Sequence, residues 1–194
     1  MIEVITGCMF SGKSEELNRR LRRAEIAGQS ITAYKPSNDN RYHSEKIASH
    51  SNSTFSAKIF KDFDHLVNLI MLDKKDNDAF PNIIAIDEVQ FLPQDIVPFV
   101  EMLAYSGVRV ITSGLDMDYQ GRPFGPMPNL LSIADKVDKI TAICIATDKS
   151  GLICGKPATR SFRVPAQDTG SLVQIGASDS YQARCRECWK RDHK

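Results

Sequence analysis

An eight-residue motif near the N-terminus constrains the fold of this chain more than any other feature. Residues 7–14 have the sequence GCMFSGKS, which fits the pattern G-x-x-x-x-G-K-[S/T] of a phosphate-binding loop. Apolar residues Ile2, Val4 and Ile5 predict a buried strand before the loop, and residues 15–27 predict a helix after it. The glycines let successive N–H groups face phosphate oxygens, and the helix N-terminus adds partial positive charge. The motif therefore predicts a nucleoside triphosphate site.

The last two residues of this loop carry most of its expected chemistry. Lys13 is placed to reach the β- and γ-phosphates, and the Ser14 hydroxyl is placed to ligate magnesium. We expect the rest of the loop to contact the phosphates as well, namely Gly7, Cys8, Met9, Phe10, Ser11 and Gly12.

Strand and helix patterns alternate after this loop. Further strands are predicted at residues 30–35, 57–60, 83–86 and 109–112. Apolar residues recur at helical spacing in residues 63–70 and again after Pro93, whereas residues 37–53 are polar and predict a loop. The helix after the phosphate loop has leucines on one side and arginines mostly opposite. This alternation predicts an α/β fold, a parallel sheet with helices on both faces.

The apolar run at residues 83–86 ends in two acids, Asp87 and Glu88. Four apolar residues followed by an acid resemble a Walker B strand, in which Asp87 would hold magnesium directly or through water. Glu88 points differently, because neighbouring strand residues alternate, and it could take a proton from an attacking hydroxyl or water. Solvated acids at a strand end are the plainer alternative, but the phosphate loop favours the functional interpretation.

The cysteines suggest a metal site in the C-terminal part of the chain. Cys185 and Cys188 are separated by two residues, Cys154 precedes a glycine, and Cys144 lies further upstream. Four thiolates from two segments fit a tetrahedral structural zinc site. The interval between Cys144 and Cys154 is longer than usual, so His193 is an alternative fourth ligand.

Composition and net charge limit the class of protein and the partners that can be expected. The chain has 194 residues, of which 42% are hydrophobic and 25% charged, as in ordinary globular proteins. Its formal net charge of +1 gives no overall field that would favour nucleic acid or a membrane. The first strand begins at once, so we expect no signal peptide and a cytoplasmic location.

Several motifs together resemble those of the type II thymidine kinases. In chain order they are MFSGKS at residues 9–14, DNRY at 39–42, DEVQF at 87–91, LD and YQ within 115–120, RPFG at 122–125, VQIG at 173–176 with Tyr181, and CREC at 185–188. They follow the family's order and span nearly the whole chain. The resemblance implies transfer of the γ-phosphoryl group of ATP to the 5′-hydroxyl of thymidine, with deoxyuridine as a further substrate, to give dTMP.

The resemblance also implies roles around the phosphates. Glu88 matches the base that takes the proton of the 5′-hydroxyl. Arg41 matches an arginine near the phosphates, and Asp39 lies beside it. Asp87 and Gln90 belong to the same ATP-binding set, with magnesium held by Ser14 and Asp87.

A thymidine pocket is implied in two parts of the chain. Residues 172–176 match a lasso loop whose main chain binds the pyrimidine edge, and a structural zinc would anchor both ends of this lasso. The implied substrate-binding residues are Met9, Phe91, Leu115, Tyr119, Phe124, Ser161, Leu172, Val173, Gln174, Ile175, Gly176 and Tyr181.

The same resemblance implies a larger organisation. An ATP-binding domain is expected over residues 1–140 and a zinc-and-lasso domain over residues 141–194, assembled as a homotetramer and inhibited by dTTP. Two other classes of protein remain open from the residues alone. A phosphate-loop ATPase or GTPase switch would use Glu88 or Gln90 to position water, and a zinc-ribbon protein would use the basic C-terminus to bind nucleic acid.

Overall fold

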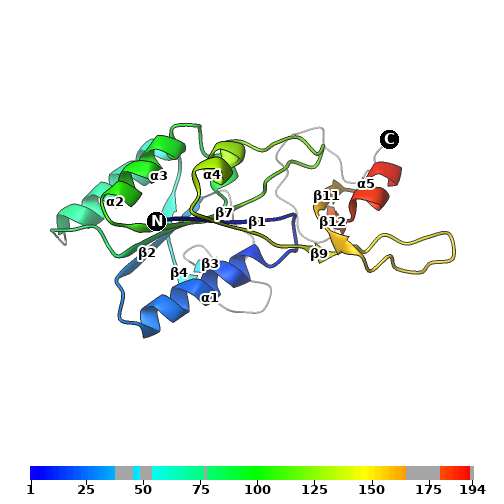
Figure 1. Cartoon of the computed structure of the whole chain (residues 1–194), viewed down its shortest axis with the longest axis horizontal. Coiled ribbons are helices and arrows are strands. Elements are labelled where there is room, and N and C mark those ends of the chain that lie inside the picture. The colour runs from blue at the N-terminus through cyan, green and yellow to red at the C-terminus, as the bar shows by residue number, and fades with distance from the viewer. Residues whose placement is uncertain (38–45, 49–53, 77, 165–179, 193–194) are drawn as a thin grey trace.

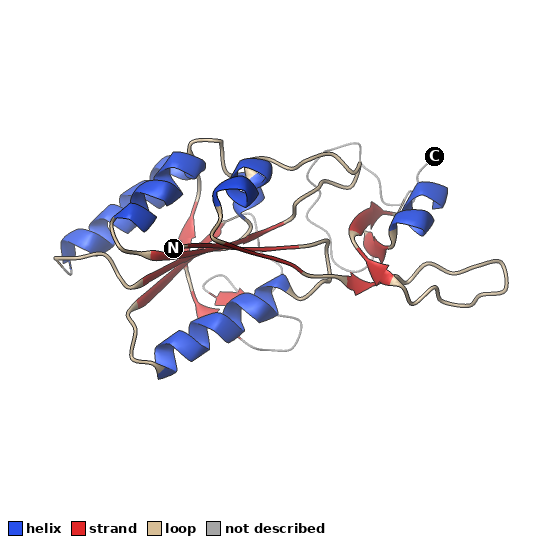
Figure 2. Ribbon diagram, viewed as in Figure 1, coloured by secondary structure: helices blue, strands red, loops and turns tan. Residues whose placement is uncertain are grey.

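The computed structural model describes residues 1–37, 46–48, 54–76, 78–164 and 180–192. Its main body is a sheet with helices on both faces (Figure 2). The strands of this sheet are β1 (Ile2–Thr6), β2 (Ile31–Pro36), β5 (Lys58–Phe60), β6 (Ile83–Ile86), β7 (Arg109–Gly114) and β8 (Lys136–Lys139).

These strands pair in the order β5-β2-β6-β7-β1-β8, and every pairing is parallel. The predicted α/β fold is thereby confirmed. Helix α1 (Lys13–Ile26) covers one face, and the other is covered by α2 (Phe63–Asp76), α3 (Ile96–Tyr105) and α4 (Met127–Ile133) (Figure 1). None of the helices in the described part of the chain is long and apolar enough to cross a membrane.

An apolar core lies on each face of the sheet. Val4 and Ile84 belong to the core under α2, α3 and α4, whereas their strand neighbours Ile5 and Ile83 belong to the core under α1, with Leu21. Successive strand residues point to opposite faces, so a strand buried on both sides needs a continuous apolar run. This explains why residues 83–86 are all apolar and do not alternate with polar residues.

The polar segment at residues 37–53 is not a loop throughout. β3 (Lys46–Ala48) lies within it and pairs antiparallel with β4 (Thr54–Ser56), so the loop prediction is wrong at residues 46–48. A strand of three residues is too short for its sequence period to be recognised, and its partner decides its conformation.

A smaller unit follows the main sheet, on the right in Figure 1. Its elements are β9 (Ala142–Ile143), β10 (Pro157–Ala158), β11 (Arg160–Arg163), β12 (Tyr181–Arg184) and α5 (Arg186–Asp192). β9 pairs antiparallel with β10, and β11 pairs antiparallel with β12. The chain between β9 and β10 projects outward as a long hairpin (Figure 1).

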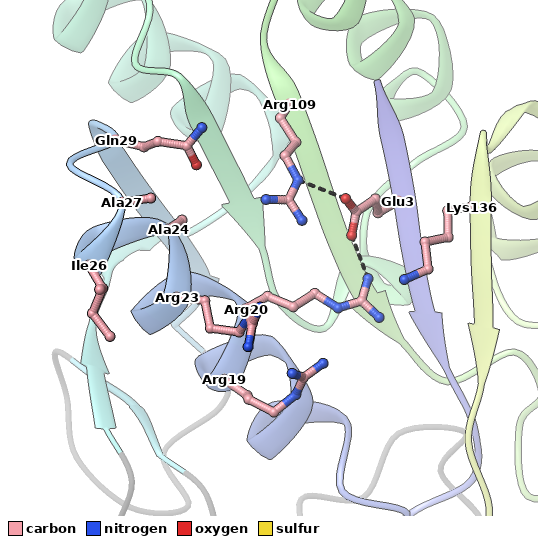
Figure 3. Close-up of a pocket in the computed structure, with 10 residues that line it drawn as sticks. All are labelled: Glu3, Arg19, Arg20, Arg23, Ala24, Ile26, Ala27, Gln29, Arg109 and Lys136. Atoms are coloured by element: carbon pink, nitrogen blue, oxygen red, sulfur yellow. Dashed lines mark hydrogen bonds and ion pairs between the residues drawn. The ribbon is translucent and has the colours of Figure 1, made fainter.

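A buried ion-pair network joins α1 to the sheet beside a cavity of about 740 Å³ (Figure 3). Glu3 accepts a hydrogen bond from Arg109 Nε at 2.7 Å and another from Arg20 Nη1 at 2.5 Å. Arg20 also bonds Glu16 and Asp138, at 2.8 and 2.5 Å. The expectation that the helix arginines point away from the core therefore fails for Arg20, because Glu3 faces α1 from β1.

Replacing Glu3 with glutamine is expected to lower the free energy of unfolding by about 3 kcal/mol. The amide leaves Arg20, which is 6% exposed, without a charged partner on β1, although Glu16 and Asp138 still compensate part of its charge. Chemical denaturation would measure the change. Glu25→Gln on the exposed side of α1 is the matched control, and an equal effect of both variants would contradict the prediction.

The same network predicts acid sensitivity. Burial raises the pKa of Glu3, but the bonds and charges of Arg109 and Arg20 outweigh it, so the net pKa lies below its ordinary value. A carboxylate with a depressed folded-state pKa stabilises the protein above its unfolded-state pKa, and this stabilisation is lost as the pH falls through the folded-state pKa. Glu3→Gln should therefore show a shallower loss of stability in acid than the wild type.

Candidate active site

The phosphate loop connects β1 to α1 at the carboxyl end of the sheet. Gly7 has φ of 151°, and a Cβ there would lie 2.2 Å from the carbonyl oxygen of Ile140, so only glycine fits. Gly12 caps α1 with φ of 87°, in the left-handed region. Lys13 Nζ donates to the Cys8 carbonyl oxygen at 2.9 Å, which holds the ammonium over the loop. The predicted strand–loop–helix arrangement is confirmed.

Two contacts attach this loop to the smaller unit. The Met9 N–H donates to Ser161 Oγ at 3.0 Å, and the Cys8 thiol donates to the Ala158 carbonyl oxygen at 3.3 Å. Burial raises the pKa of the Cys8 thiol, so this group stays protonated and acts as a structural donor. The loop is therefore held both by the main sheet and by β10 and β11.

Asp87 and Glu88 follow β6 at the same edge of the sheet as the phosphate loop. Asp87, 3% exposed, accepts hydrogen bonds at Oδ1 from the Glu88 N–H at 3.0 Å and from the Ser113 hydroxyl. Glu88 is 8% exposed and has φ of 50°, a left-handed conformation that favours glycine. Holding a non-glycine residue there costs on the order of 1 kcal/mol, and such strain concentrates at functional sites.

Gln90 links Glu88 to the loop after β7. Its Nε2 donates to Glu88 Oε2 at 2.5 Å, and its Oε1 accepts from the Leu115 N–H at 3.1 Å. The side chain lies in η1 (Val89–Phe91), a single 3-10 turn that directly follows the two acids. Gln90 is predicted to belong to the ATP-binding set, and in the described structure its side chain bonds the Glu88 carboxylate and the Leu115 N–H.

The aromatic residues predicted for the nucleoside pocket form two groups. Phe91 and Phe124 pack edge to face, with ring centroids 5.6 Å apart. Tyr119 and Tyr181 are brought together by Arg163, whose Cζ lies 3.7 Å from the Tyr119 ring centroid and whose Nη2 donates to the Tyr181 hydroxyl at 2.7 Å. Sequence reasoning missed Arg163, although strand alternation places it on the same face as Ser161, two residues earlier.

Some predicted site residues lie outside the described part of the chain. These are Asp39, Arg41, Leu172, Val173, Gln174, Ile175 and Gly176. Met9, Leu115, Ser14 and the other phosphate-loop residues are described, and they lie at the same end of the sheet as Glu88.

The four cysteines predicted to bind zinc form one cluster. Their sulfurs all lie within 4.8 Å of one another, and Cys154 Sγ is 3.9 Å from Cys185 Sγ. A tetrahedron with metal–sulfur bonds of about 2.3 Å has edges of about 3.8 Å, so the cluster matches the size of a tetrathiolate zinc site. His193, the alternative ligand, lies outside the described residues.

The long interval between Cys144 and Cys154 is accommodated by a hairpin. Cys154 N–H donates to the Ala146 carbonyl oxygen at 2.7 Å, and Gly155 N–H donates to that of Cys144 at 3.0 Å. Asp148 closes the tip by accepting from the N–H groups of Ser150 and Leu152. The extra residues extend away from the cluster and leave both thiols at the base of the hairpin.

Two thiols of the cluster have pKa values shifted in opposite directions. Burial and the neighbouring thiols raise the pKa of Cys188. Burial raises the pKa of the Cys185 thiol, but the Cys188 N–H and the neighbouring thiols outweigh it and lower this pKa to about 7. Thiolates are the form that binds metal, so the backbone already supports a ligand at this position.

The parallel sheet, the phosphate loop after its first strand and the two acids at a nearby strand end define a phosphate-loop nucleotide-binding enzyme. The family model described as "Thymidine kinase" matches residues 1–189, and the chain belongs to this family. The protein is therefore a kinase that phosphorylates thymidine.

Solved structures resemble the chain in fold. The genome packaging NTPase from Sulfolobus turreted icosahedral virus 2, solved in complex with ATP-gammaS, is 15% identical with a TM-score of 0.50, and the match covers 77% of each chain. A structure described as "ATPase" is 14% identical with a TM-score of 0.47, over 95% of this chain and 79% of the other. At 15% identity, the similarity to the packaging NTPase supports the fold of this chain and nothing about its function.

Proposed function

We propose that the protein transfers the γ-phosphoryl group of ATP to the 5′-hydroxyl of thymidine, and also to that of deoxyuridine, giving dTMP or dUMP and ADP. The observation that carries this proposal is the placement of Glu88. It is a buried carboxylate in a strained backbone conformation, at the same edge of the sheet as the phosphate loop. A kinase needs a general base beside the attacking hydroxyl, and Glu88 is placed to serve as one. An ATPase could use the same carboxylate to position water, so the thymidine kinase family match is what favours a nucleoside as the acceptor.

In the proposed reaction the Glu88 carboxylate takes the proton of the 5′-hydroxyl as that oxygen attacks the γ-phosphorus. The bond between the γ-phosphorus and the bridging oxygen breaks, and ADP leaves with the electron pair. Lys13 and the backbone N–H groups of residues 7–14 neutralise charge on the phosphates. Ser14 and Asp87 would hold Mg²⁺, which supplies further charge neutralisation when bound, and Arg41 with Asp39 would act beside the phosphates.

We assign the nucleoside pocket to the Phe91–Phe124 pair, which begins three residues after Glu88, and to Tyr119. Phe91, Phe124 and Tyr119 offer flat apolar surfaces of the kind that hold a pyrimidine. The bond from the Met9 N–H to Ser161 Oγ, which attaches β11 to the phosphate loop, supports a pocket that adjoins the phosphate end of the site. By the family resemblance, Leu115, Tyr181 and residues 172–176 complete this pocket.

We propose that Cys144, Cys154, Cys185 and Cys188 hold a structural Zn²⁺. The number of thiols and the dimensions of the cluster support this assignment. The metal would fix the ends of residues 155–184, which include β11 and β12, without contacting substrate. The proposed division into an ATP-binding domain up to residue 140 and a zinc-and-lasso domain from residue 141 follows from this role.

We further propose a homotetrameric assembly and inhibition by dTTP, which rest on the family resemblance alone. We also propose a cytoplasmic location without a nucleic-acid or membrane partner, and this rests on the sequence pattern and the net charge of +1. Size-exclusion chromatography with light scattering would test the first directly.

A nucleoside panel tests the proposed function. The protein is incubated with ATP and magnesium and with thymidine, deoxyuridine, deoxycytidine or deoxyadenosine in turn, and nucleoside monophosphate is measured. We expect phosphorylation of thymidine above the others and almost no ATP turnover without nucleoside. ATP hydrolysis that persists without any nucleoside would instead favour the ATPase alternative.

dTTP is expected to compete with thymidine. Its base and sugar match the nucleoside site, while its triphosphate reaches toward the phosphate loop. Initial rates should therefore show an apparent KM for thymidine that rises with dTTP concentration at constant maximal rate. No inhibition at millimolar dTTP would reject this proposal.

A further inference from the structure

Arg163 is a buried arginine at the end of β11, 4% exposed to solvent. In the β11–β12 pair it lies opposite Tyr181. Its Nε and Nη2 both donate to the Tyr181 hydroxyl, at 3.2 and 2.7 Å. The arginine therefore approaches the phenol with one edge of its guanidinium, through two N–H groups.

Two donated hydrogen bonds fix what the phenol can do. A tyrosine hydroxyl has one proton to donate and accepts through its oxygen lone pairs. With both bonds from Arg163 made to that oxygen, the remaining capacity of Tyr181 is its O–H donor. Within the described part of the chain, this proton has no acceptor, although Tyr181 is only 6% exposed. Buried donors are normally paired, so Tyr181 is placed to donate to an acceptor outside the described residues, and a bound nucleoside would present one.

The same guanidinium contacts the other tyrosine of the proposed pocket. Its Cζ lies 3.7 Å from the Tyr119 ring centroid, at stacking distance, and 5.3 Å from that of Tyr181. A cation against an aromatic face restricts the ring and contributes about 1 kcal/mol or more when buried. One side chain thus orients two residues that come from segments far apart in the sequence.

We infer that Arg163 is a positioning residue for nucleoside binding, which fixes the Tyr181 hydroxyl as a donor toward an acceptor oxygen of the substrate and holds the Tyr119 ring in place. This inference rests on the proposed function. A substrate that presents a hydrogen-bond donor at that point would meet another donor, so the pair also contributes to selectivity for nucleosides with a carbonyl or hydroxyl oxygen there.

The test is a double-mutant cycle of Arg163→Met and Tyr181→Phe, with thymidine and ATP kinetics and with thymidine binding by calorimetry. Each single variant should raise the KM and Kd for thymidine about tenfold, the worth of one good hydrogen bond, with the KM for ATP unchanged. The double variant should raise them by about ten- to thirtyfold, well short of the hundredfold expected for independent sites.

Arg184→Met is the matched control. Arg184 is a buried arginine of the same strand pair, but its guanidinium lies 5.1 Å from the Phe162 ring centroid and bonds Gln182, not a pocket tyrosine. We expect thymidine KM within about twofold of the wild type for this variant. Arg163→Lys is a second variant in case Arg163→Met does not fold. The lysine keeps a positive charge near Tyr119 but cannot make the paired bonds to Tyr181, so this variant should also raise the KM for thymidine.

Thymidine analogues that each lack one acceptor oxygen then locate the partner of Tyr181. For one of them, Tyr181→Phe should no longer weaken binding. Unchanged thymidine KM in both Arg163 variants, or fully multiplicative effects in the cycle, would overturn the inference while leaving the proposed function in place. A wild-type protein that binds no thymidine would overturn both.

Discussion

Glu88→Gln is expected to lower kcat for thymidine phosphorylation by about 10² to 10⁴, with little change in ATP binding. The amide keeps the size of the side chain and can remain beside Gln90, but it cannot accept the proton of the 5′-hydroxyl. The left-handed backbone at Glu88 is set by the turn from β6 into η1, so the substitution should not relax it.

Steady-state kinetics and nucleotide binding by calorimetry or fluorescence would measure the two quantities separately. Glu101→Gln on α3 is the control, since this carboxylate lies on a helix that packs on the face of the sheet away from α1. If Glu88→Gln kept wild-type turnover, the proton would have to leave by another route, and the assignment of Glu88 would be wrong. Loss of ATP binding together with turnover would instead indicate a disturbed phosphate loop.

The elements around the phosphate loop were predictable because local sequence determines them. A glycine-rich phosphate loop is recognisable because its residues specify both the turn and the strand and helix on either side. Gly7 is an example, since a Cβ there would collide with the Ile140 carbonyl oxygen. The buried strand at residues 83–86 was predictable for a related reason: burial on both faces leaves a continuous apolar run.

Other features depend on contacts between distant segments and left no local signal. Arg20 lies in a helix pattern that assigns arginines to solvent, yet Glu3 on β1 draws it inward. Arg163 is one of many arginines in the sequence, and only its pairing with Tyr181 distinguishes it. The position of Cys144 likewise could not be judged from its spacing, because the hairpin between the cysteines closes through its own backbone bonds.

The proposed site therefore has two parts that the sequence predicts unequally well. The phosphate end follows from motifs within single turns of chain, whereas the nucleoside end requires β11 and β12 to be held against the phosphate loop. The contacts of Met9 with Ser161 and of Cys8 with Ala158 join the two ends. Anything that loosens the smaller unit should thus impair nucleoside binding before it impairs phosphate binding.

Loss of the proposed zinc is expected to destabilise the smaller unit more than any other single change. Structural zinc sites in small domains contribute on the order of 10 kcal/mol, and the described part of the smaller unit has few apolar residues around the cysteines to replace such a contribution. Cys185→Ser should abolish stoichiometric zinc binding and lower the melting temperature. It should also weaken thymidine binding by more than about tenfold, while ATP binding changes less than about threefold.

Elemental analysis should find one zinc per chain in the wild type and none retained by Cys185→Ser after dialysis. Cys8→Ser is the control for metal content, because this fifth cysteine bonds Ala158 outside the cluster and should leave the zinc in place. Equal loss of thymidine and ATP binding in Cys185→Ser would contradict a role confined to the smaller unit. A wild-type protein that is fully stable and active without metal would show that packing and backbone bonds alone hold β11 and β12 against the phosphate loop.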